Sequence, residues 1–387
     1  MRHILWVNEQ AQWQGGCEQY LWNTVSLLKA RGVRSSLLYD GTRKQPSPEY
    51  LQVFDAVFPM VDIVRQVRAI SPGLIYIHRL DGAEPIRQFA AAQIPAARFF
   101  HDHKLFCLRE HKYKALSHNT CTKPIGPRCY TCPGFVRRTS GPLGFSLATL
   151  RGLRAEQRAN RALTAFVVGS HYMRNHVAEH GFDPSRIHVL PLYAFPAKET
   201  GSVAREADVL LFVGQLVRGK GLDVLLKALA VTRCNARLIV IGAGKQEGDY
   251  RVQCGALGLS NRVSFDGTAT GDKLSEYYRR AACVVFPSRA PETFGLIGPE
   301  AMSHGTPVIA TAVGGIGEWL EDGVNGLTVP SNDAAPLAHA IDRLMGDPVL
   351  ARRLGETARQ RYEDRFRPER HIDALIVLYD GLTRKGH

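Results

Sequence analysis

The sequence predicts an α/β protein with two parallel-sheet domains, and three observations support this prediction. The chain has 387 residues, more than one hydrophobic core usually needs. It opens with a strand–helix–strand pattern, the unit from which parallel sheets are built. After residues 193–208, which lack an apolar period, a second alternation of strands and helices begins. We therefore expect an N-terminal domain over 1–195 and a C-terminal domain over 206–365.

The composition is that of a folded soluble protein, with 45% hydrophobic and 22% charged residues. No apolar run reaches the roughly 18–20 residues that a membrane-spanning helix needs. The N-terminus, MRHILWVNEQ, is typical of a strand rather than a signal peptide. These features predict a cytoplasmic protein with reduced thiols.

The opening unit consists of a strand at 2–7, a helix at 17–31 and a strand at 33–39. Gly15 and Gly16 precede the helix, where bare backbone N–H groups can face an anion. A plain tight turn explains the glycine pair equally well.

Further strands are expected at 53–58, 73–78 and 96–100, and the last runs directly into His101 and His103. Polar residues at the carboxyl ends of parallel strands lie where open α/β sheets bind ligands. A histidine there can donate to a leaving oxygen or orient a hydroxyl group. We favour such a role for His101 and a structural role for His103, although a histidine bonded to the backbone is the alternative for both.

Residues 104–145 are predicted to be an insertion that is basic and rich in Pro, Gly and Cys. It contains Cys107, Cys121, Cys129 and Cys132, and the last two form a CxxC. Four thiolates suit a structural zinc ion, with no open position for catalysis. The first pair is split more widely than in a zinc ribbon, so unmetallated thiols, a disulfide and an iron–sulfur centre remain alternatives.

Positive charge is concentrated in one part of the chain. The net charge is +13, and between Arg98 and Arg161 there are 13 Lys/Arg against three acids, an excess of ten positive charges. Such a block suits an anionic membrane face, a phosphate-bearing acceptor or nucleic acid. A solvated basic surface is the simplest alternative.

In the second domain, a strand at 209–213 leads to a glycine-rich turn, 214–221, with two cations, Arg218 and Lys220. Glycines allow close approach to a diphosphate and the cations neutralise its charge, although a solvated basic turn would look the same locally. The P-loop pattern GxxxxGK[ST] is absent. Several other strand ends converge on the same edge of this sheet, which indicates a nucleotide-type ligand: 242–245, 267–268 and 287–296.

Two carboxylates, Glu292 and Glu300, flank the turn Thr293–Leu296, which is expected to open a helix. A strand at 307–311 and the pair Gly314-Gly315 follow. Carboxylates beside a helix start suit a ligand that is part phosphate and part hydroxyl-rich sugar. Amphipathic helices are expected after residue 330, the last at 370–381.

Three runs together resemble retaining glycosyltransferases of family four, which have the GT-B fold: GGCEQYLWNTVSLLKARGV, GQLVRGKGLDVLLKAL and PSRAPETFGLIGPEAMSHGTPVIATAVGGIGEWLEDGVNGLTVP. The resemblance covers nearly the whole chain. It implies two Rossmann-like domains facing across a cleft, with nucleotide sugar bound by the C-terminal domain and acceptor by the N-terminal one. The final segment, 366–387, would pack back toward the N-terminal domain. A cysteine-rich insertion occurs in only a subset of the family.

The resemblance also implies residue roles. Glu300 would hold the ribose and Glu292 the donor sugar. Lys220, with Arg218, would neutralise the diphosphate. The remaining contacts would come from the N–H groups of Phe294, Gly295 and Leu296, from Gly16 in the other domain, and from His101 near the reacting sugar. One departure is Gln215, which stands where many relatives have arginine.

The expected function is that of a retaining glycosyltransferase of the hexosyltransferase type, with His101, Glu292 and Lys220 as catalytic residues. It would move a sugar from a nucleoside diphosphate, UDP slightly favoured, to a saccharide or lipid-linked acceptor in bacterial polysaccharide or glycolipid synthesis. No catalytic metal is expected, and the basic block favours peripheral attachment to the inner membrane face. The alternatives are a nucleotide-sugar epimerase of the same fold and a zinc-ordered nucleic-acid-binding protein. The second leaves the phosphate-type loops unexplained.

Overall fold

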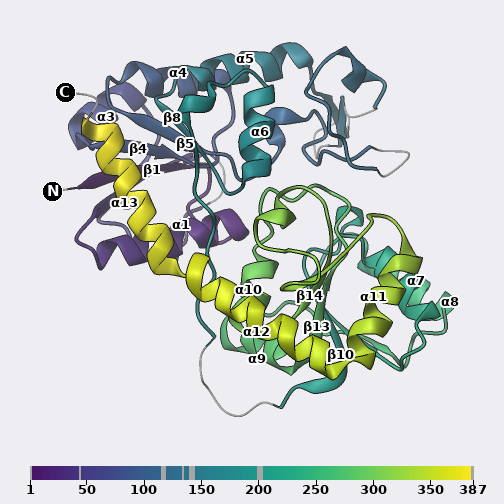
Figure 1. Cartoon of the computed structure of the whole chain (residues 1–387). Helices are drawn as coiled ribbons and strands as arrows, with labels where there is room; N and C mark the ends of the chain where they lie inside the picture. The colour runs from purple at the N-terminus through teal and green to yellow at the C-terminus, as the bar shows by residue number, and fades with distance from the viewer. Residues whose placement is uncertain are drawn as a thin grey trace. The chain divides into compact units, whose positions relative to one another are not determined.

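The structure is a computed structural model that describes residues 2–42, 45–114, 119–132, 135–138, 144–197 and 204–384. The chain divides into two compact units, each with its own parallel sheet (Figure 1). Unit 1 comprises Met1–Glu110, Lys123–Leu190 and Glu369–His387, and unit 2 comprises His111–Thr122 and Pro191–Pro368. The predicted α/β fold class with two parallel-sheet domains is confirmed.

Unit 1 is built on a seven-stranded parallel sheet in the order β3-β2-β1-β4-β5-β8-β9. Its central strands are buried along their whole length, because helices cover both faces and the strands are continuous apolar runs. The bounds of the strands are β1 (His3–Asn8), β2 (Arg34–Tyr39), β3 (Ala56–Pro59), β4 (Leu74–Ile77), β5 (Ala96–Phe99), β8 (Ala165–Val168) and β9 (Ile187–Val189).

The helices of unit 1 begin at side chains that cap their free N–H groups. Asp62, Thr149 and Ser170 each accept a hydrogen bond from the first turn of the helix that follows. Thr149 therefore fixes the start of α5 at Leu150. The helices are α1 (Gly16–Lys29), α2 (Pro48–Leu51), α3 (Ile63–Ile70), α4 (Ala83–Ala91), α5 (Leu150–Arg161), α6 (His171–Glu179) and α13 (Pro368–Arg384).

The last helix, α13, belongs to unit 1 although it follows unit 2 in the chain (Figure 1). The Tyr20 hydroxyl lies 2.8 Å from Nε2 of His371, and Arg2 forms an ion pair with Asp380 at 2.8 Å. Contacts along both ends of the helix therefore attach it to the N-terminal sheet.

Unit 2 contains a six-stranded sheet in the order β12-β11-β10-β13-β14-β15, and all pairs are parallel. Its strands are β10 (Glu206–Val213), β11 (Arg237–Ile241), β12 (Val263–Phe265), β13 (Ala281–Phe286), β14 (Val308–Thr311) and β15 (Gly326–Val329). Its helices are α7 (Leu222–Val231), α8 (Glu247–Ala256), α9 (Gly271–Arg280), α10 (Ile297–Ser303), α11 (Ala334–Gly346) and α12 (Pro348–Arg365). Strand β10 begins three residues before the apolar run, because Arg237 and Arg280 bind Glu206 at the polar end of the strand.

The predicted insertion is shared between the two units, which differs from its assignment to the N-terminal domain. In unit 1 it forms short helical turns and an antiparallel hairpin of β6 (Val136–Arg138) and β7 (Phe145–Leu147). Residues 111–122 instead belong to unit 2. The Thr120 hydroxyl donates to the Arg289 carbonyl at 3.0 Å, a pairing between positions 169 residues apart that sequence periodicity does not reveal.

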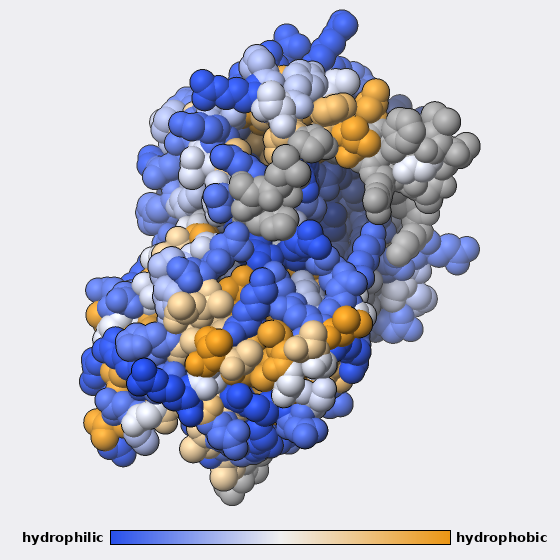
Figure 2. All heavy atoms as spheres, turned by 90° about the vertical axis from the view of Figure 1, so that its right-hand side faces the viewer, coloured by the Kyte–Doolittle hydropathy of each residue, from blue (hydrophilic) through white to orange (hydrophobic). Residues whose placement is uncertain are grey.

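The surface is mainly hydrophilic on the face seen in Figure 2, where hydrophobic side chains form separate patches. Within the described ranges, none of the helices combines the length and the apolar character required to cross a bilayer.

Candidate functional site

The carboxyl ends of β10 and β13 define a switch point in unit 2, because β11 and β13 lie on opposite sides of β10. Open α/β sheets bind ligands at such points. The loop 214–221 follows β10 and the loop 287–296 follows β13, so both sequence-predicted phosphate loops leave the sheet here.

Glycines allow the chain to pass closely at this edge. Gly221 has a φ of 74°, and a Cβ on it would lie 2.0 Å from the carbonyl oxygen of Pro287. Gly242 has a φ of 144°, and a Cβ there would lie 1.8 Å from the carbonyl oxygen of Gly214. Any side chain would force these loops apart, so glycine is required at both positions.

Lys220 and Glu292 meet at the centre of this edge. The Lys220 ammonium lies 2.8 Å from Oε1 and 3.1 Å from Oε2 of Glu292, and both side chains are largely buried. The buried Ser288 hydroxyl donates to Glu292 Oε1 at 2.6 Å. The structure thus brings together two predicted site residues that are 72 positions apart.

Arg289 holds the two loops together and was not singled out by the sequence. Its guanidinium is 3% exposed, forms two hydrogen bonds to Asp223 at 2.8 and 2.9 Å, and donates to the Arg218 carbonyl at 2.8 Å. The backbone N–H groups of Arg289 and Ala290 both donate to the Gly219 carbonyl. The sequence around Arg289 does not indicate that this side chain pairs with Asp223 at the start of α7.

The turn before α10 presents its backbone donors as predicted. Within the described ranges, the N–H groups of Phe294, Gly295 and Leu296 have no hydrogen-bond acceptor. Trp319 Nε1 donates to the Phe294 carbonyl at 2.8 Å, and this hydrogen bond holds the turn at Phe294–Leu296 in place. Gly295, with a φ of 87°, provides the reversal that an L side chain rarely adopts. Three neighbouring free donors can bind an anion.

Glu300 lies on α10 and contacts Tyr278, which accounts for its orientation. The buried Tyr278 hydroxyl donates to Glu300 Oε2 at 2.6 Å. Burial raises the pKa of the Glu300 carboxyl, and the hydrogen bond from Tyr278 lowers it in part. One carboxylate oxygen, Oε1, is thereby left for a ligand hydroxyl.

The remaining predicted cation, Arg218, has an exposed side chain two residues before Lys220. Gln215 is also exposed, at the start of the same loop. A partner for the Arg218 guanidinium is not found within the described part of the chain, so this side chain is available to an anionic ligand.

Residues 111–122 add an aromatic ring to this site. An ideal Cβ on Gly219 would lie 3.2 Å from Cε1 of Tyr113, so the ring packs directly on the phosphate loop. Tyr113 also forms an antiparallel bridge with Thr120, and Thr120 is bonded to Arg289. The insertion therefore supports both loops of the site.

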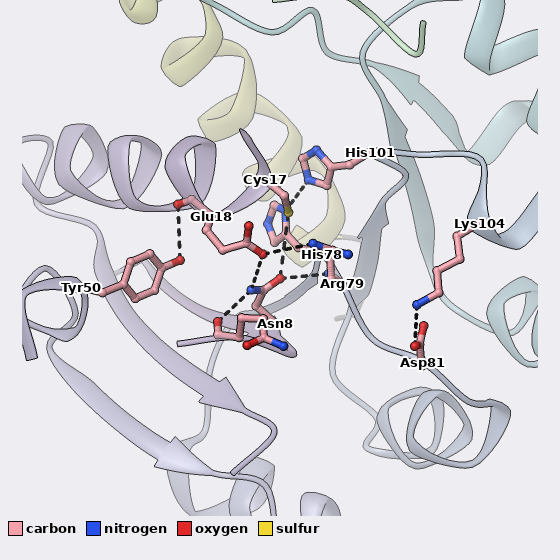
Figure 3. Close-up of polar contacts among 10 residues, drawn as sticks. Asn8, Cys17, Glu18, Tyr50, His78, Arg79, Asp81, His101 and Lys104 are labelled. Atoms are coloured by element: carbon pink, nitrogen blue, oxygen red, sulfur yellow. Dashed lines mark hydrogen bonds and ion pairs between the residues drawn. The ribbon is translucent and has the colours of Figure 1, made fainter. Parts of the chain in front are cut away.

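Unit 1 has its own switch point at β1 and β4. The predicted histidine, His101, follows the neighbouring strand β5 and lies close to His78, which follows β4 (Figure 3). His101 Nε2 is 2.7 Å from Nδ1 of His78, which follows β4. The Cys17 thiol, at the start of α1, is near both rings, with the three potential ligand atoms within 4.8 Å of one another. The sequence identified His101 and missed His78 and Cys17, because only the sheet order brings these three loops together.

Both histidines of this pair are uncharged at neutral pH. Burial, followed by the Arg79 guanidinium, lowers the pKa of His101 to about 3. Burial also holds the pKa of His78 well below its usual range, and burial raises the pKa of the Cys17 thiol. His101 also stacks on Phe99 with ring centroids 4.1 Å apart, so its position is fixed.

Gly16 is the first residue of α1, beside this cluster. A Cβ on Gly16 would meet no described atom within 4 Å, so internal packing does not require glycine here. A small cavity of about 30 Å³ also adjoins His101. Its charged lining includes Lys104 and Asp81, which form an ion pair at 2.5 Å (Figure 3).

The four cysteines of the insertion are divided between the two units. No disulfide joins them among the described residues, and Cys121 belongs to unit 2 whereas the other three belong to unit 1. Among the described residues, Cys107, Cys129 and Cys132 do not form a group with ligand atoms within 4.8 Å. A structural zinc ion at these cysteines remains a prediction.

Comparison with known proteins addresses the identity of unit 2. The model of the family "glycosyl transferases group 1" matches residues 198–361. The matched region covers less than half of the chain. It contains Lys220, Glu292 and Glu300, together with the loops that hold them.

Two relatives that match the chain are named glycosyltransferases. The chain is 34% identical over 229 residues to a D-inositol 3-phosphate glycosyltransferase of Frankia alni, covering 53% of this chain and 56% of the relative. It is 36% identical over 147 residues to an uncharacterized glycosyltransferase of Methanocaldococcus jannaschii, covering 38% and 37%. The chain spans about half or less of the length of these relatives.

Solved structures with a similar fold cover nearly the whole chain. HepE of Anabaena, crystallised with UDP, superposes with a TM-score of 0.76 at 20% identity, covering 98% of this chain and 100% of HepE. Sucrose-phosphate synthase of Thermosynechococcus elongatus superposes with a TM-score of 0.73 at 21% identity, covering 100% of both chains. The GT-B fold predicted from the sequence is confirmed.

Proposed function

We propose that the chain is a retaining glycosyltransferase that moves a sugar from a nucleoside diphosphate to an acceptor hydroxyl. One observation carries the proposal: a Lys220–Glu292 pair beside three free N–H groups, at the switch point of a group 1 domain. The relatives are named glycosyltransferases, and HepE was crystallised with UDP, which favours a UDP-sugar as donor.

The loops of unit 2 would hold the donor. The N–H groups of Phe294, Gly295 and Leu296 would bind diphosphate oxygens, and Lys220 and Arg218 would neutralise their charge. The Glu300 carboxylate would accept hydrogen bonds from ribose hydroxyls, and Glu292 from hydroxyls of the transferred sugar. Lys220 would then exchange its contact with Glu292 for the phosphate, which releases that carboxylate for the sugar.

In the reaction, the bond between the anomeric carbon and the diphosphate oxygen breaks while a bond to the acceptor oxygen forms on the same face. The acceptor proton passes to the departing phosphate oxygen, so the atoms and charges balance. Negative charge grows on the diphosphate as it leaves, and Lys220 and Arg218 stabilise that charge. Unit 1 would supply the acceptor site, with neutral His101 bonded to a hydroxyl near the reacting carbon and Gly16 close to the phosphate.

We further propose an acceptor, a pathway and a location for the enzyme. A saccharide or lipid-linked acceptor, a place in cell-surface polysaccharide or glycolipid synthesis, and a cytoplasmic or peripheral membrane location all follow from the basic block and from the family resemblance.

The first experiment screens thermal stabilisation of the purified chain with UDP-, GDP- and ADP-sugars. A ligand present at 100 times its Kd adds about 2.7 kcal/mol to the free energy of unfolding, an easily measured shift. The stabilising donor is then incubated with candidate acceptors, and the anomeric configuration of the initial product is read by NMR. Inverted product disproves retention, and stabilisation by none of the nucleotide sugars contradicts the donor site.

A further inference from the structure

Helix α5 of unit 1 carries four arginines along one face. Arg151, Arg154, Arg158 and Arg161 are spaced by three, four and three residues. Side chains at these spacings lie one above another on an α-helix. The helix therefore presents a continuous row of guanidinium groups, and none of the residues proposed to bind donor lies on it.

These arginines line an open hollow of about 860 Å³ between α5, the end of α6 and residues 124–130 of the insertion. Hydrogen bonds fix its walls. The Ile125 N–H donates to Nε2 of His180 at 3.2 Å, and the Leu150 N–H donates to the Tyr130 hydroxyl at 3.4 Å. Among the described residues of its lining, Glu179 and the arginines are the charged groups, so positive charge predominates.

The charge of this row is largely uncompensated. Arg151, Arg154 and Arg158 are exposed, and no ion-pair or hydrogen-bond partner for their side chains occurs within the described ranges. Arg161 donates to the His180 carbonyl and lies over the Phe182 ring, and its Nε–H is buried without an acceptor among the described residues. The three exposed guanidinium groups are therefore available to an anionic ligand.

Such a row destabilises the isolated helix. Like charges at these spacings repel by about 0.2–0.5 kcal/mol per pair. The helix dipole favours Arg158 and Arg161 in the last turn but disfavours Arg151 in the first. Exposure to water alone would not compensate for this repulsion. A bound anion would offset it, because the anion attracts each guanidinium group.

We propose that the hollow on α5 is a binding site for a phosphate or diphosphate group. Arginine binds phosphate through paired N–H donors, and several arginines in a row suit a diphosphate. Apolar parts of Ile125, Tyr130 and Leu150 share the lining, so the phosphate belongs to a molecule with an apolar portion. A phospholipid headgroup and the phosphate of a lipid-linked acceptor both have this chemistry. Only the link to an acceptor rests on the proposed function.

The test uses calorimetric titration of the full-length protein with inorganic pyrophosphate. Wild type is compared with R151Q/R154Q, with K220A, and with R65Q/R68Q as control. Arg65 and Arg68 are exposed on α3 of the same unit at the same spacing of three residues, so the control removes equal charge elsewhere. Equal melting temperatures of the variants establish that they are folded.

We expect two classes of pyrophosphate site. R151Q/R154Q weakens one class by about tenfold or more, because two charge-assisted contacts are lost, and K220A leaves that class unchanged. Equal weakening by R65Q/R68Q, or no effect of R151Q/R154Q, overturns the proposal. If K220A weakens no pyrophosphate site while R151Q/R154Q weakens one, the assignment of the donor site is wrong and the proposed α5 site is supported.

Vesicle flotation then distinguishes the sources of the phosphate. Vesicles of phosphatidylcholine with phosphatidylglycerol are compared with phosphatidylcholine alone. Loss of both vesicle and pyrophosphate binding in R151Q/R154Q identifies a membrane headgroup. Loss of pyrophosphate binding alone identifies the phosphate of an acceptor. Loss of vesicle binding with unchanged pyrophosphate binding indicates a diffuse charged surface and contradicts the proposed site.

Discussion

The ammonium of Lys220 lies between the two carboxylate oxygens of Glu292, 2.8 and 3.1 Å away, with the Phe286 ring centroid 5.3 Å below it. The pair joins the loops after β10 and β13. A cation held against a carboxylate in this way can move to a more strongly charged diphosphate without leaving the site.

Lys220→Ala is expected to lower kcat/KM by about 100- to 1000-fold, because one preorganised group that stabilises the leaving diphosphate is lost. Initial-rate kinetics with saturating acceptor measure this effect. Lys227→Ala is the control, since Lys227 is exposed on α7 of the same unit. A similar loss in both variants would show that general charge, not position, is responsible.

Gly314→Ala is expected to destabilise unit 2 and to abolish donor binding. Gly314 has a φ of 62°, and a Cβ would lie 2.3 Å from the Glu292 carbonyl oxygen and displace the Glu292 loop. Strain of this kind costs about 1–3 kcal/mol. Gly317→Ala is the control, because a Cβ there meets no described atom within 4 Å. Urea unfolding and donor titration of both variants decide the outcome, and equal stability would contradict it.

Glu300 is expected to make stability depend on pH. Burial raises the pKa of its carboxyl above the ordinary 4.5, so the folded state holds the proton more tightly than the unfolded state. This contribution is present below pH 4.5 and is lost as the pH rises through the raised pKa. Glu300→Gln keeps an acceptor for Tyr278 and removes the charge. Its free energy of unfolding should therefore rise relative to wild type as the pH increases from 4.5 through the raised pKa. A constant difference across this range refutes the expectation.

The His78–His101 pair should destabilise the protein in acid. The pKa of His101 falls from 6.5 to about 3 on folding, so its stabilising contribution is present above pH 6.5 and is lost as the pH falls toward 3. Each such group costs up to about 1.4 kcal/mol per pH unit in this window. His101→Phe retains an aromatic ring on Phe99 and should show a shallower decline in urea unfolding. An unchanged slope would mean that His101 titrates normally.

Tyr113→Ala is expected to raise the donor KM by about tenfold, because the ring that packs on Gly219 helps to hold the Lys220 loop. Tyr113→Phe keeps the ring and should restore the wild-type value. Steady-state kinetics of both variants test this role. If Phe fails to rescue, the hydroxyl rather than the packing matters. Unchanged KM in both variants excludes a role of this segment in donor binding.

The sequence predicted which residues would meet at the proposed donor site, because the motif residues are grouped in two short runs. Lys220, Glu292 and the turn at Phe294–Leu296 are brought together as expected. The pairing of Arg289 with Asp223 could not be predicted, since Arg289 lies in a loop without periodicity and Asp223 lies 66 residues away in the first turn of α7. Tyr278 was missed for a similar reason: on α9 it looks like an ordinary core tyrosine.

In the insertion, the sequence did not predict how the segment divides between the two units. Cysteine spacing predicted a zinc site, and the ion remains a prediction. The same segment supports the phosphate loop through Tyr113 and forms one wall of the arginine-lined hollow. Spacing along the chain carries no information about which unit a loop without apolar period packs against.

The sequence by itself determined the two parallel sheets, since alternating buried strands and amphipathic helices require that arrangement, and it determined the chemistry of the two phosphate loops. The tertiary structure alone decided which side chains meet. His78 contacts His101 and Tyr113 packs on Gly219. The four arginines of α5 line a hollow together with residues of the insertion. The order of the strands and the packing of the loops produce these contacts. These contacts join residues far apart in the chain, and only the folded backbone sets their distances.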